Sequence, residues 1–385
     1  MPAPEHPSVP RQPDPAASKR IARLLAARRN YRAEVLALTA SSRFVAFYGC
    51  GAIFGSILET WRDLVGRNID FCCDSNPQKW GKVYCGVTCI SPAELENYKD
   101  ELAVFVTVGD FEPVLDDLAN RKFPCVHLIY KYDLVSSDYL SRQNLEEVGA
   151  KLDEVRSMLA DDRSVRVFDC TLDRLLDAGS APGLMAGVCE GNQYFPPDLI
   201  RLKPDESFVD AGAFTGDTVG DFHGRTGGSF DSIHCFELNA ANFLGLQSTV
   251  SSLPGAGKIF LHPEGLWNEP LDISYSVELS QSTIGAGDAL GHVARLDDLI
   301  GNARVTLLKM DIEGAELKAI EGARGTILAN KPKLAICVYH HFKDLWEIPL
   351  FIKKLVPEYR IFLRHHTKLE YETVCYALLP GDVTA

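Results

Sequence analysis

The stretch Phe208-Val209-Asp210-Ala211-Gly212-Ala213-Phe214-Thr215-Gly216-Asp217-Thr218 decides the fold. It begins as an apolar strand, passes through a glycine-rich turn and continues into a helical pattern. In an open α/β sheet, such a turn holds a cofactor, because glycine lets the backbone approach the ligand. Any tight strand-to-helix turn favours glycine too, so a purely structural turn stays open. The predicted cofactor contacts in this stretch are Asp210, Gly212, Phe214, Gly216, Asp217 and Thr218.

The next two strands add further candidates for cofactor contacts. Ile233-His234-Cys235-Phe236 is followed by Glu237, about twenty residues beyond the glycines, where a carboxylate meets ribose hydroxyls. We therefore predict Glu237 as the ribose ligand, with Leu238 beside it; the alternative is a solvated loop residue. Gly265-Leu266-Trp267 follows a third strand and is predicted to lie beside an adenine. An ordinary core position for Trp267 is an equal alternative.

Strand and helix patterns alternate twice along the chain, which predicts an α/β fold with two Rossmann-like domains. A helix over 18–39 is expected to pack on the first domain, and 137–176 has helical spacing. The expected organisation is a disordered tail (1–17), a small Rossmann-like domain (18–135), a helical connector (136–190) and a second domain (191–385). The expected strands are 44–48, 69–73, 103–108 and 126–130 in the first domain, and 207–210, 232–236, 258–261, 306–310, 333–339, 359–365 and 373–379 in the second.

Three motifs of the second half together resemble the FkbM family of methyltransferases: Asp210–Thr218, Phe236-Glu237-Leu238-Asn239-x-x-Asn242-Phe243, and Leu308-Lys309-Met310-Asp311-Ile312-Glu313-Gly314-Ala315-Glu316. The similarity continues through 331–340, 344–349, 363–366 and 372–374. It implies a seven-stranded sheet with an antiparallel final hairpin. It also implies methyl transfer from S-adenosylmethionine to a small molecule or glycan, usually at oxygen. Phe214 departs from the family, in which Tyr or Asn is more familiar.

Histidines and acids at the ends of the fourth and fifth strands are the catalytic candidates. Asp311 and Glu313 follow the fourth strand, and His340 and His341 end the fifth. Since a sugar hydroxyl must lose its proton, we predict His340 as the general base, oriented by Asp311, with His341 as its alternative. Histidines that only cap a strand, and acids that only begin a helix, are the structural alternatives. Asp311 is also a predicted cofactor contact. Asp311 and Glu313 could also help to hold Mg²⁺, which leaves a metal requirement open, but no dedicated metal site is predicted, because a hard cation needs several converging oxygens.

The first domain has a weaker signal of its own. Gly49, Gly51 and Gly55 form a loose glycine motif, and Asp74 lies about twenty residues beyond it. The pattern Asp74-x-Asn76-x-x-Lys79-x-Gly81, followed by Gly86 and Ser91-Pro92-x-x-Leu95, resembles small Rossmann domains attached to sugar-modifying enzymes, some of which hold nucleotide sugars. Ligand binding and a structural or dimerising role are both open. An NAD-dependent oxidoreductase and a sugar-nucleotide binding protein are therefore the rival functions.

Composition excludes several classes of partner. The 385 residues have a net charge of −13 and no Lys/Arg-rich run, which argues against nucleic acid. The eleven cysteines include no C-x-x-C pair and are expected to be reduced. Neither a signal peptide nor a membrane span is indicated, so a cytoplasmic enzyme without a membrane partner is expected. The expected partner is a small-molecule or glycan substrate, and assembly into a homo-oligomer is left open.

Overall fold

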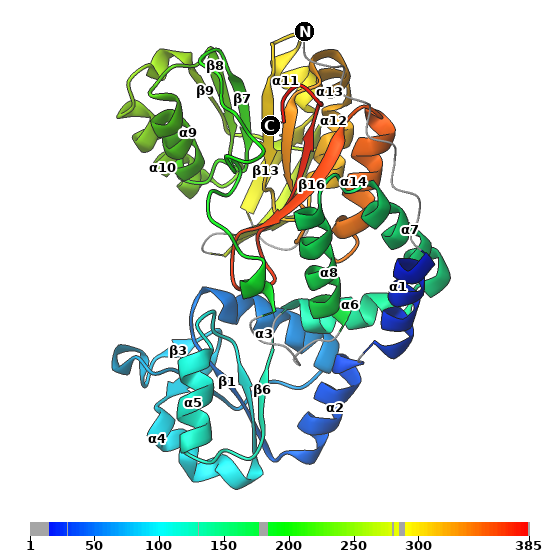
Figure 1. The fold of residues 1–385 in the computed structure, drawn as a ribbon. Helices are drawn as coiled ribbons and strands as arrows, with labels where there is room; N and C mark the ends of the chain where they lie inside the picture. The colour runs from blue at the N-terminus through cyan, green and yellow to red at the C-terminus, as the bar shows by residue number, and fades with distance from the viewer. Residues whose placement is uncertain are drawn as a thin grey trace.

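The computed structural model describes residues 15–28, 30–129, 131–176, 184–278, 281–284 and 289–383. Two mainly parallel sheets lie in two lobes, and helices from the middle of the chain lie between them (Figure 1). Of the tail expected at 1–17, residues 1–14 lie outside the described residues. Residues 15–17 belong instead to the first helix, α1 (Pro15–Ala27).

The N-terminal sheet has six strands in the order β3-β4-β2-β1-β5-β6. All neighbouring strands are parallel except the short β3–β4 hairpin, which the sequence analysis missed because its two strands span only two and four residues. The strands are β1 (Phe44–Tyr48), β2 (Phe71–Cys73), β3 (Val83–Tyr84), β4 (Val87–Ile90), β5 (Leu102–Val106) and β6 (Val126–Leu128). The helices are α2 (Tyr31–Ser41), α3 (Ala52–Val65), α4 (Pro92–Leu95) and α5 (Glu112–Asn120), with 3₁₀ turns at Pro77–Lys79 and Glu96–Glu101.

The single helix predicted over 18–39 is wrong, because the chain forms two helices there. The side chain of Asn30 accepts a hydrogen bond from the Ala33 N–H and starts α2. Helix α2 packs on the first domain as expected, but α1 does not. Ile21 and Leu25 of α1 join the hydrophobic core of the C-terminal half, and Arg20 pairs with acids of a later helix. An amphipathic pattern predicts that one face of a helix is buried, but it does not identify the element against which that face packs.

The helical spacing of 137–176 forms three helices, α6 (Lys131–Ser141), α7 (Leu145–Met158) and α8 (Asp162–Leu176). Helix α1 packs on α7 and α8, and α8 packs on strand β16 of the second sheet. In the part of the chain that the structure describes, no helix is both long enough and apolar enough to cross a membrane.

The C-terminal sheet has seven strands in the order β16-β17-β15-β14-β7-β8-β9. The five strands from β15 to β9 run parallel, and β17 pairs antiparallel with both β15 and β16, so the predicted fold class is confirmed. The strands are β7 (Ser207–Ala211), β8 (Ser232–Phe236), β9 (Ile259–His262), β14 (Leu307–Met310), β15 (Lys333–Cys337), β16 (Arg360–His365) and β17 (Thr373–Leu378).

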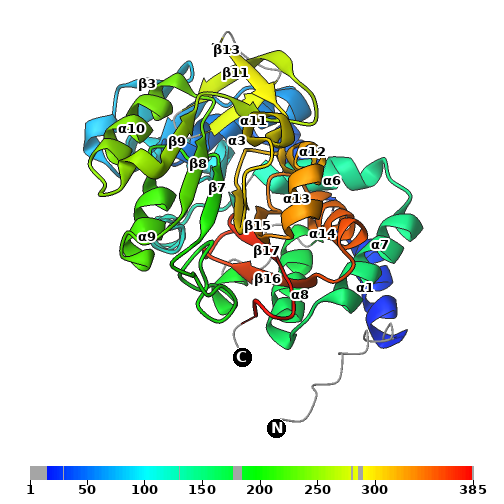
Figure 2. The same ribbon diagram turned by 90° about the horizontal axis from the view of Figure 1, so that it is seen from above.

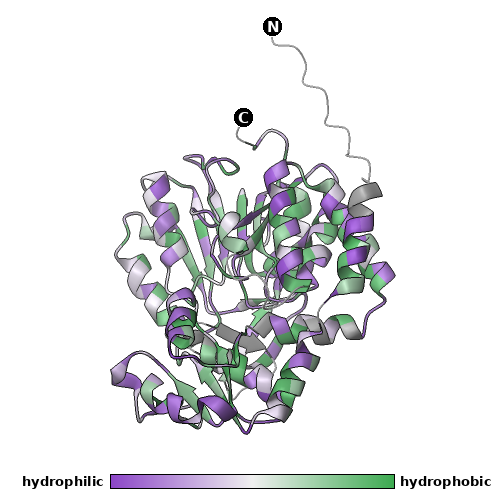
Figure 3. Ribbon diagram, turned by 60° about the horizontal axis from the view of Figure 1, so that its bottom comes forward, coloured by the Kyte–Doolittle hydropathy of each residue, from purple (hydrophilic) through white to green (hydrophobic). Residues whose placement is uncertain are grey.

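Helices cover both faces of this sheet (Figure 2). Helices α9 and α10 contribute to the core on one face, and α12, α13 and α14 to the core on the other. The helices are α9 (Asp217–Thr226), α10 (Ala240–Ser251), α11 (Leu296–Ile300), α12 (Glu316–Gly322), α13 (Arg324–Asn330) and α14 (Asp344–Leu355), with 3₁₀ turns at Met185–Gly187 and Ala256–Lys258. Apolar strands inside and mixed helices outside are visible when the ribbon is coloured by hydropathy (Figure 3).

A second, four-stranded sheet in the order β10-β13-β11-β12 was not predicted. It lies between the third and fourth strands of the main sheet along the chain, where Ser, Gly and Asp interrupt the apolar pattern. Its strands are β10 (Gly265–Leu266), β11 (Leu271–Glu278), β12 (Gln281–Ile284) and β13 (Ala289–Ala294).

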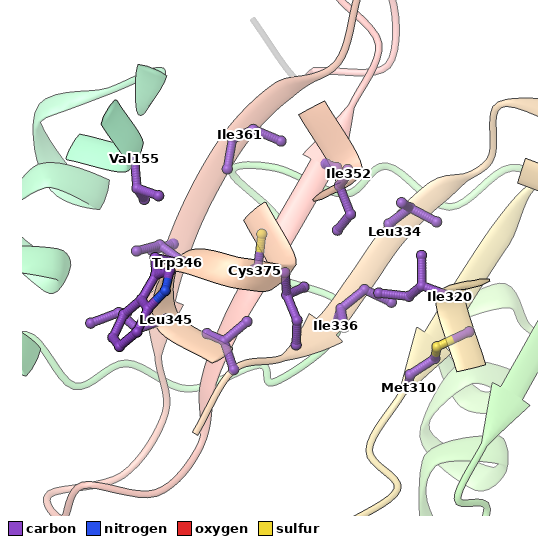
Figure 4. Close-up of a cluster of buried hydrophobic side chains, with 14 of the residues drawn as sticks. Val155, Met310, Ile320, Leu334, Ile336, Leu345, Trp346, Ile352, Ile361 and Cys375 are labelled. Carbon is purple, nitrogen blue, oxygen red and sulfur yellow. The ribbon is translucent and has the colours of Figure 1, made fainter. Parts of the chain in front are cut away.

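The largest core joins the main sheet to the connector helices. Leu334 and Ile336 of β15 face α12 and α14, whereas their neighbours Ala335 and Cys337 face the opposite core, as strand alternation requires. Figure 4 shows Val155 of α7 beside Ile361 and Trp346, next to this layer. The connector is thus packed as part of the C-terminal core.

Arg174 connects the two halves of the chain through a buried ion pair. Its guanidinium lies 2.7 Å from Asp133 of α6 and 3.4 Å from Glu370, in the turn between β16 and β17. Leu369 in the same turn packs on the core of the N-terminal sheet. The turn of the final hairpin therefore contacts α8 through Glu370 and the core of the first lobe through Leu369.

Replacing Arg174 with Met should destabilise the protein by about 3–5 kcal/mol, because two buried carboxylates lose their cation. Urea unfolding followed by circular dichroism measures this loss. The control is Arg43→Met, which breaks an exposed pair with Glu101 and should cost less than about 1 kcal/mol. Equal losses in the two variants would contradict the importance of the buried pair.

Candidate functional site

Backbone geometry fixes the glycines of the loop after β7. Gly212 and Gly216 have φ angles of +76° and +90°. A Cβ at Gly212 would lie 1.8 Å from the Asp311 carbonyl oxygen, and one at Gly216 would lie 3.0 Å from the Thr249 side chain. Both glycines are therefore required by the protein itself: Gly212 brings the loop against the end of β14, and Gly216 brings it against α10.

Glu237 holds this loop from the neighbouring strand. Its two carboxylate oxygens accept hydrogen bonds from the Phe214 N–H at 2.9 Å and the Asn239 N–H at 2.7 Å. Burial raises the pKa of Glu237, and these two N–H groups oppose the rise. Each oxygen has a second lone pair, so the carboxylate can still accept hydrogen bonds from a ligand.

Asp210 is paired inside the sheet. It lies opposite Lys309 in the register of β7 and β14, and the Lys309 ammonium is 2.9 Å from its Oδ1. Lys309 also donates to the carbonyls of Ala211 and Gly212. Burial raises the pKa of Asp210 and would lower that of Lys309, but the Asp210 charge keeps the Lys309 pKa above its ordinary value. Asp210 is fully buried and supports the loop from below.

The other predicted cofactor residues lie around this loop. Asp217 and Thr218 open α9, the first exposed and the second buried. Leu238 packs on Gly265, and its carbonyl accepts a hydrogen bond from Tyr275 of the small sheet. Leu266 is buried, whereas Trp267 is half-buried and its carbonyl lies against α12. Gly212, Phe214, Glu237, Leu238 and Gly265 thus form one group, and the Trp267 backbone lies on the α12 side of it.

Asp311 belongs to a second group at the ends of β14 and β15. Its carboxylate accepts hydrogen bonds from Tyr194 at 2.6 Å and Tyr339 at 2.9 Å. The His340 Nε2 lies 3.4 Å from oxygens of both Asp311 and Glu313. On the other side of the ring, Nδ1 lies 3.0 Å from Glu316. One imidazole is therefore bordered by three carboxylates.

These neighbours change the ionisation of the group. Burial would lower the pKa of His340, but Glu316 and Glu313 raise it well above its ordinary value. Burial, reinforced by Glu316, raises the pKa of Asp344 to about 7. Burial, reinforced by Asp311, also raises the pKa of Glu372 to about 7. The carboxylates of this group outnumber its buried histidine, so a protonated His340 cannot neutralise all of their negative charge.

His341 has a different environment from His340. It is exposed, and its backbone N–H donates to Asp344 at 2.9 Å. Its ring lies over Gly314, where a Cβ would come within 2.4 Å of the His341 Nε2. Gly314 has a φ of +98°, so glycine is needed there for both reasons. The sequence places the two histidines side by side, and the structure separates their surroundings.

Several residues of the second group were not predicted. Glu316 belongs to the quoted Asp-Ile-Glu-Gly-Ala-Glu motif and Glu372 to the segment 372–374 that resembles the family, so both could have been found from the sequence. Tyr194 comes from a distant segment without a local signal. Backbone strain marks the same region, since non-glycine residues with positive φ cost free energy and often gather at functional sites. Those near the two groups are Tyr194, Phe214, Glu313 and Glu372.

The glycine loop of the first domain is held by an acid from the next strand, as the loop after β7 is held by Glu237. Asp74 accepts hydrogen bonds from the N–H groups of Cys50 and Asn76, as Glu237 does from its own loop. It also pairs with Lys79 at 2.7 Å. Gly49 has a φ of +116° and no room for a Cβ, whereas a Cβ at Gly51 would meet nothing within 4 Å. In the first domain, the acid is already bound to a cation of the chain.

Comparison with known proteins agrees with the C-terminal fold. Residues 286–369 match the family model described as the Methyltransferase FkbM domain. The chain carries a methyltransferase domain of the FkbM family. The predicted family and the prediction of a methyltransferase enzyme with S-adenosylmethionine as cofactor are thereby confirmed. A search of curated proteins found no match.

Solved structures with a similar fold include a methyltransferase FkbM from Methylobacillus flagellatus KT, with a TM-score of 0.74 and 24% identity over 94% of this chain and 98% of that one. The similarity covers both lobes. A putative rRNA methylase from Clostridium thermocellum has a TM-score of 0.33 and 11% identity, over 47% of this chain and 89% of that one. An rRNA methylase from Streptococcus thermophilus has a TM-score of 0.31 and 13% identity, over 46% and 90%.

Gly212→Ala should destabilise the protein by more than about 3 kcal/mol, because the left-handed φ and the contact with the Asp311 carbonyl both oppose a side chain. The loss is measured by urea unfolding. The matched control is Gly227→Ala, at a φ of +59° with nothing within 4 Å of its Cβ, where only about 1–2 kcal/mol is expected. Equal losses would show that the contact with Asp311 contributes nothing.

Proposed function

We propose that this chain transfers a methyl group from S-adenosylmethionine to an oxygen of a sugar, a nucleotide sugar or another small hydroxylated metabolite, in the cytoplasm. The position of Asp311 supports this proposal most strongly. Its backbone carbonyl lies against Gly212 of the glycine loop, and its carboxylate meets His340 and two tyrosines. A single residue thus joins a cofactor loop to a polar group suited to a hydroxylated acceptor.

The residues of the loop fit the cofactor. The Glu237 carboxylate would accept the ribose hydroxyls, and Gly212, Phe214 and Gly216 would lie along the methionine part. Asp217 and Thr218, at the start of α9, and Asp311 would complete that side. Leu238, Gly265, Leu266 and Trp267 would border the adenine. Asp210 would act through Lys309 and the loop carbonyls, because it is completely buried. When bound, S-adenosylmethionine supplies a methyl group already activated by the sulfonium charge.

The protein must then align the acceptor oxygen and remove its proton. His340 was the predicted base, but both its ring nitrogens face carboxylates and its raised pKa favours the protonated form. A protonated imidazole cannot accept a proton. We therefore assign the general base to its neighbour His341, whose side chain is exposed beside Gly314. His340 and Asp311 become positioning residues for the acceptor.

The chemistry of the second group favours hydroxyl groups over nucleic acid. Carboxylates accept hydrogen bonds from hydroxyls, whereas a phosphodiester backbone would be repelled by Asp311, Glu313 and Glu372 and by the net charge of −13. Incubating the enzyme and S-adenosylmethionine with panels of sugars, nucleotide sugars and glycan fragments, and measuring S-adenosylhomocysteine release, tests the acceptor class. Turnover confined to RNA would contradict the proposal.

We propose a first domain over 18–135, a connector over 136–190 and the FkbM domain over 191–385. The first domain has a subordinate role. An oxidoreductase needs a free ribose acid, but Asp74 is paired with Lys79. This pairing argues against NAD chemistry there. The opening beside Gly51 is compatible with holding part of a nucleotide-linked acceptor. We therefore rank acceptor binding above the rival oxidoreductase function.

Glu237→Ala should weaken S-adenosylmethionine binding by about 1–3 kcal/mol, the usual cost of leaving buried partners unpaired. Glu237→Gln keeps the shape and one accepting oxygen, so it should lose less. Isothermal titration calorimetry measures both affinities. If Glu237→Ala bound the cofactor as tightly as the unmodified protein, Glu237 would not be the ribose ligand.

His341→Ala should lower turnover by about 10²–10⁴, the usual contribution of a general base, while S-adenosylmethionine affinity is retained. The control is His292→Ala, since His292 is an exposed residue of the small sheet paired with Asp272. Turnover is measured as S-adenosylhomocysteine release with the acceptor found in the panel. Near-normal turnover of His341→Ala would return the role to His340 or Asp311.

A further inference from the structure

We propose that Asp311, Glu316 and His340, with Glu313 beside them, form a binding site for one divalent cation. The first three residues each offer a ligand atom, and these atoms lie within 4.8 Å of one another. The sequence offered Asp311 and Glu313 as residues that could help to hold Mg²⁺, but no dedicated cluster was predicted. The inference rests on the proposed function for the role of the cation, but its binding can be tested separately.

The spacing of the ligand atoms suits a coordination sphere. The His340 Nε2 lies 3.4 Å from oxygens of Asp311 and Glu313, and its Nδ1, on the other side of the ring, lies 3.0 Å from Glu316. Only one of the two nitrogens can bind a given cation. Ligands about 2.0–2.2 Å from a shared metal ion lie about 3 Å apart when they are neighbours on the sphere. Small side-chain rotations would bring the ligands onto one cation.

An independent observation is the absence of hydrogen bonds to a buried imidazole. The His340 side chain is only 6% exposed, and within the described residues neither ring nitrogen makes a hydrogen bond, despite the short distances to carboxylates. The Oε2 of Glu316, a fully buried residue, also has no hydrogen-bond partner there. Buried polar atoms nearly always have partners, so an unpaired imidazole nitrogen and an unpaired carboxylate oxygen in the same buried group indicate a missing ligand.

The negative charge of the group indicates that the missing ligand is a cation. Asp311, Glu313 and Glu316 together carry three negative charges, and without a cation a protonated His340 balances only one. A bound cation would take the place of that proton, because a histidine ligand is neutral. Lys309 is already paired with Asp210. Buried carboxylates without compensation are costly, and a divalent cation would remove most of the excess. An anion or a neutral ligand would not reduce this excess of negative charge.

The donor set also limits the kind of cation. Carboxylate oxygens suit Mg²⁺ and Mn²⁺, and an imidazole nitrogen favours first-row transition metals, so Mn²⁺ satisfies both. Three or four protein ligands leave positions open for oxygens of another molecule. At the ends of β14 and β15, beside the glycine loop, those positions would receive acceptor hydroxyls. The preferred acceptors would then carry two neighbouring oxygens.

Mn²⁺ binding to the full chain, after treatment with a chelator and its removal, tests the site directly. Calorimetry and electron paramagnetic resonance should show one Mn²⁺ per chain without acceptor or S-adenosylmethionine. Glu316→Gln, which preserves shape, and His340→Gln should each weaken Mn²⁺ at least about tenfold, since the loss of one ligand or its partner costs roughly 10–100-fold. The matched control is Glu321→Gln on the same helix, where Glu321 pairs with Lys318 and Asn268.

The same samples are titrated with S-adenosylmethionine, which keeps this proposal distinct from the proposed function. Stoichiometric Mn²⁺ binding lost in Glu316→Gln and His340→Gln, with circular dichroism unchanged, supports the site, whatever the acceptor. Absence of saturable Mn²⁺ binding, or binding retained in both variants, overturns it even if methyl transfer occurs. Should Glu316→Gln fail to fold, His340→Gln and the direct titration of the unmodified chain still decide the question.

Discussion

The buried ammonium of Lys309 is the interaction on which the methyltransferase lobe depends. It sits on the central strand β14, pairs with Asp210 across the register and donates to the first two carbonyls of the glycine loop. The Ala211 carbonyl also accepts a hydrogen bond from the Asp311 N–H, which ties the start of the loop to the end of β14. The loop is therefore fixed from beneath by charge and from the side by Glu237, before any ligand binds. Such preorganisation reduces the entropy that binding would otherwise cost.

Crowding of acids is the second constraint, and it follows from the topology. Parallel strands β14 and β15 end at the same edge of the sheet, so the motif after the first strand and the histidines after the second must meet there. The hairpin turn adds Glu372 and the segment before the sheet adds Tyr194, both with positive φ. Repulsion and backbone strain at this edge are tolerated because two large cores hold the surrounding strands in place.

Local patterns predicted much of the fold, and the remainder depended on contacts between distant segments. The seven strands, the antiparallel hairpin and the glycine loop each have a signal within about ten residues of sequence. Helix α1 has an equally clear pattern, yet its partner lies more than a hundred residues away on α7 and α8. The residues of the site also fall into two classes, those with a local sequence signal and those whose role depends on contacts between segments. Glu237 and Asp311 could be found from their motifs, whereas the different environments of His340 and His341 depend on Glu316 and Gly314 folding back beneath them.

In both lobes an acid after the second strand holds the glycine loop, but within the described part of the chain only the first lobe pairs that acid with a lysine. In each, an acid at the end of the second strand accepts hydrogen bonds from N–H groups of the glycine loop and of its own turn. In the first lobe, Lys79 also neutralises Asp74, whereas Glu237 has no ion pair among the described residues. A neutralised acid is a weaker acceptor for ribose hydroxyls, while the Lys79 ammonium brings positive charge beside the opening at Gly51. The difference of one lysine thus leaves Glu237 more available than Asp74 as an acceptor for the hydroxyls of a ribose.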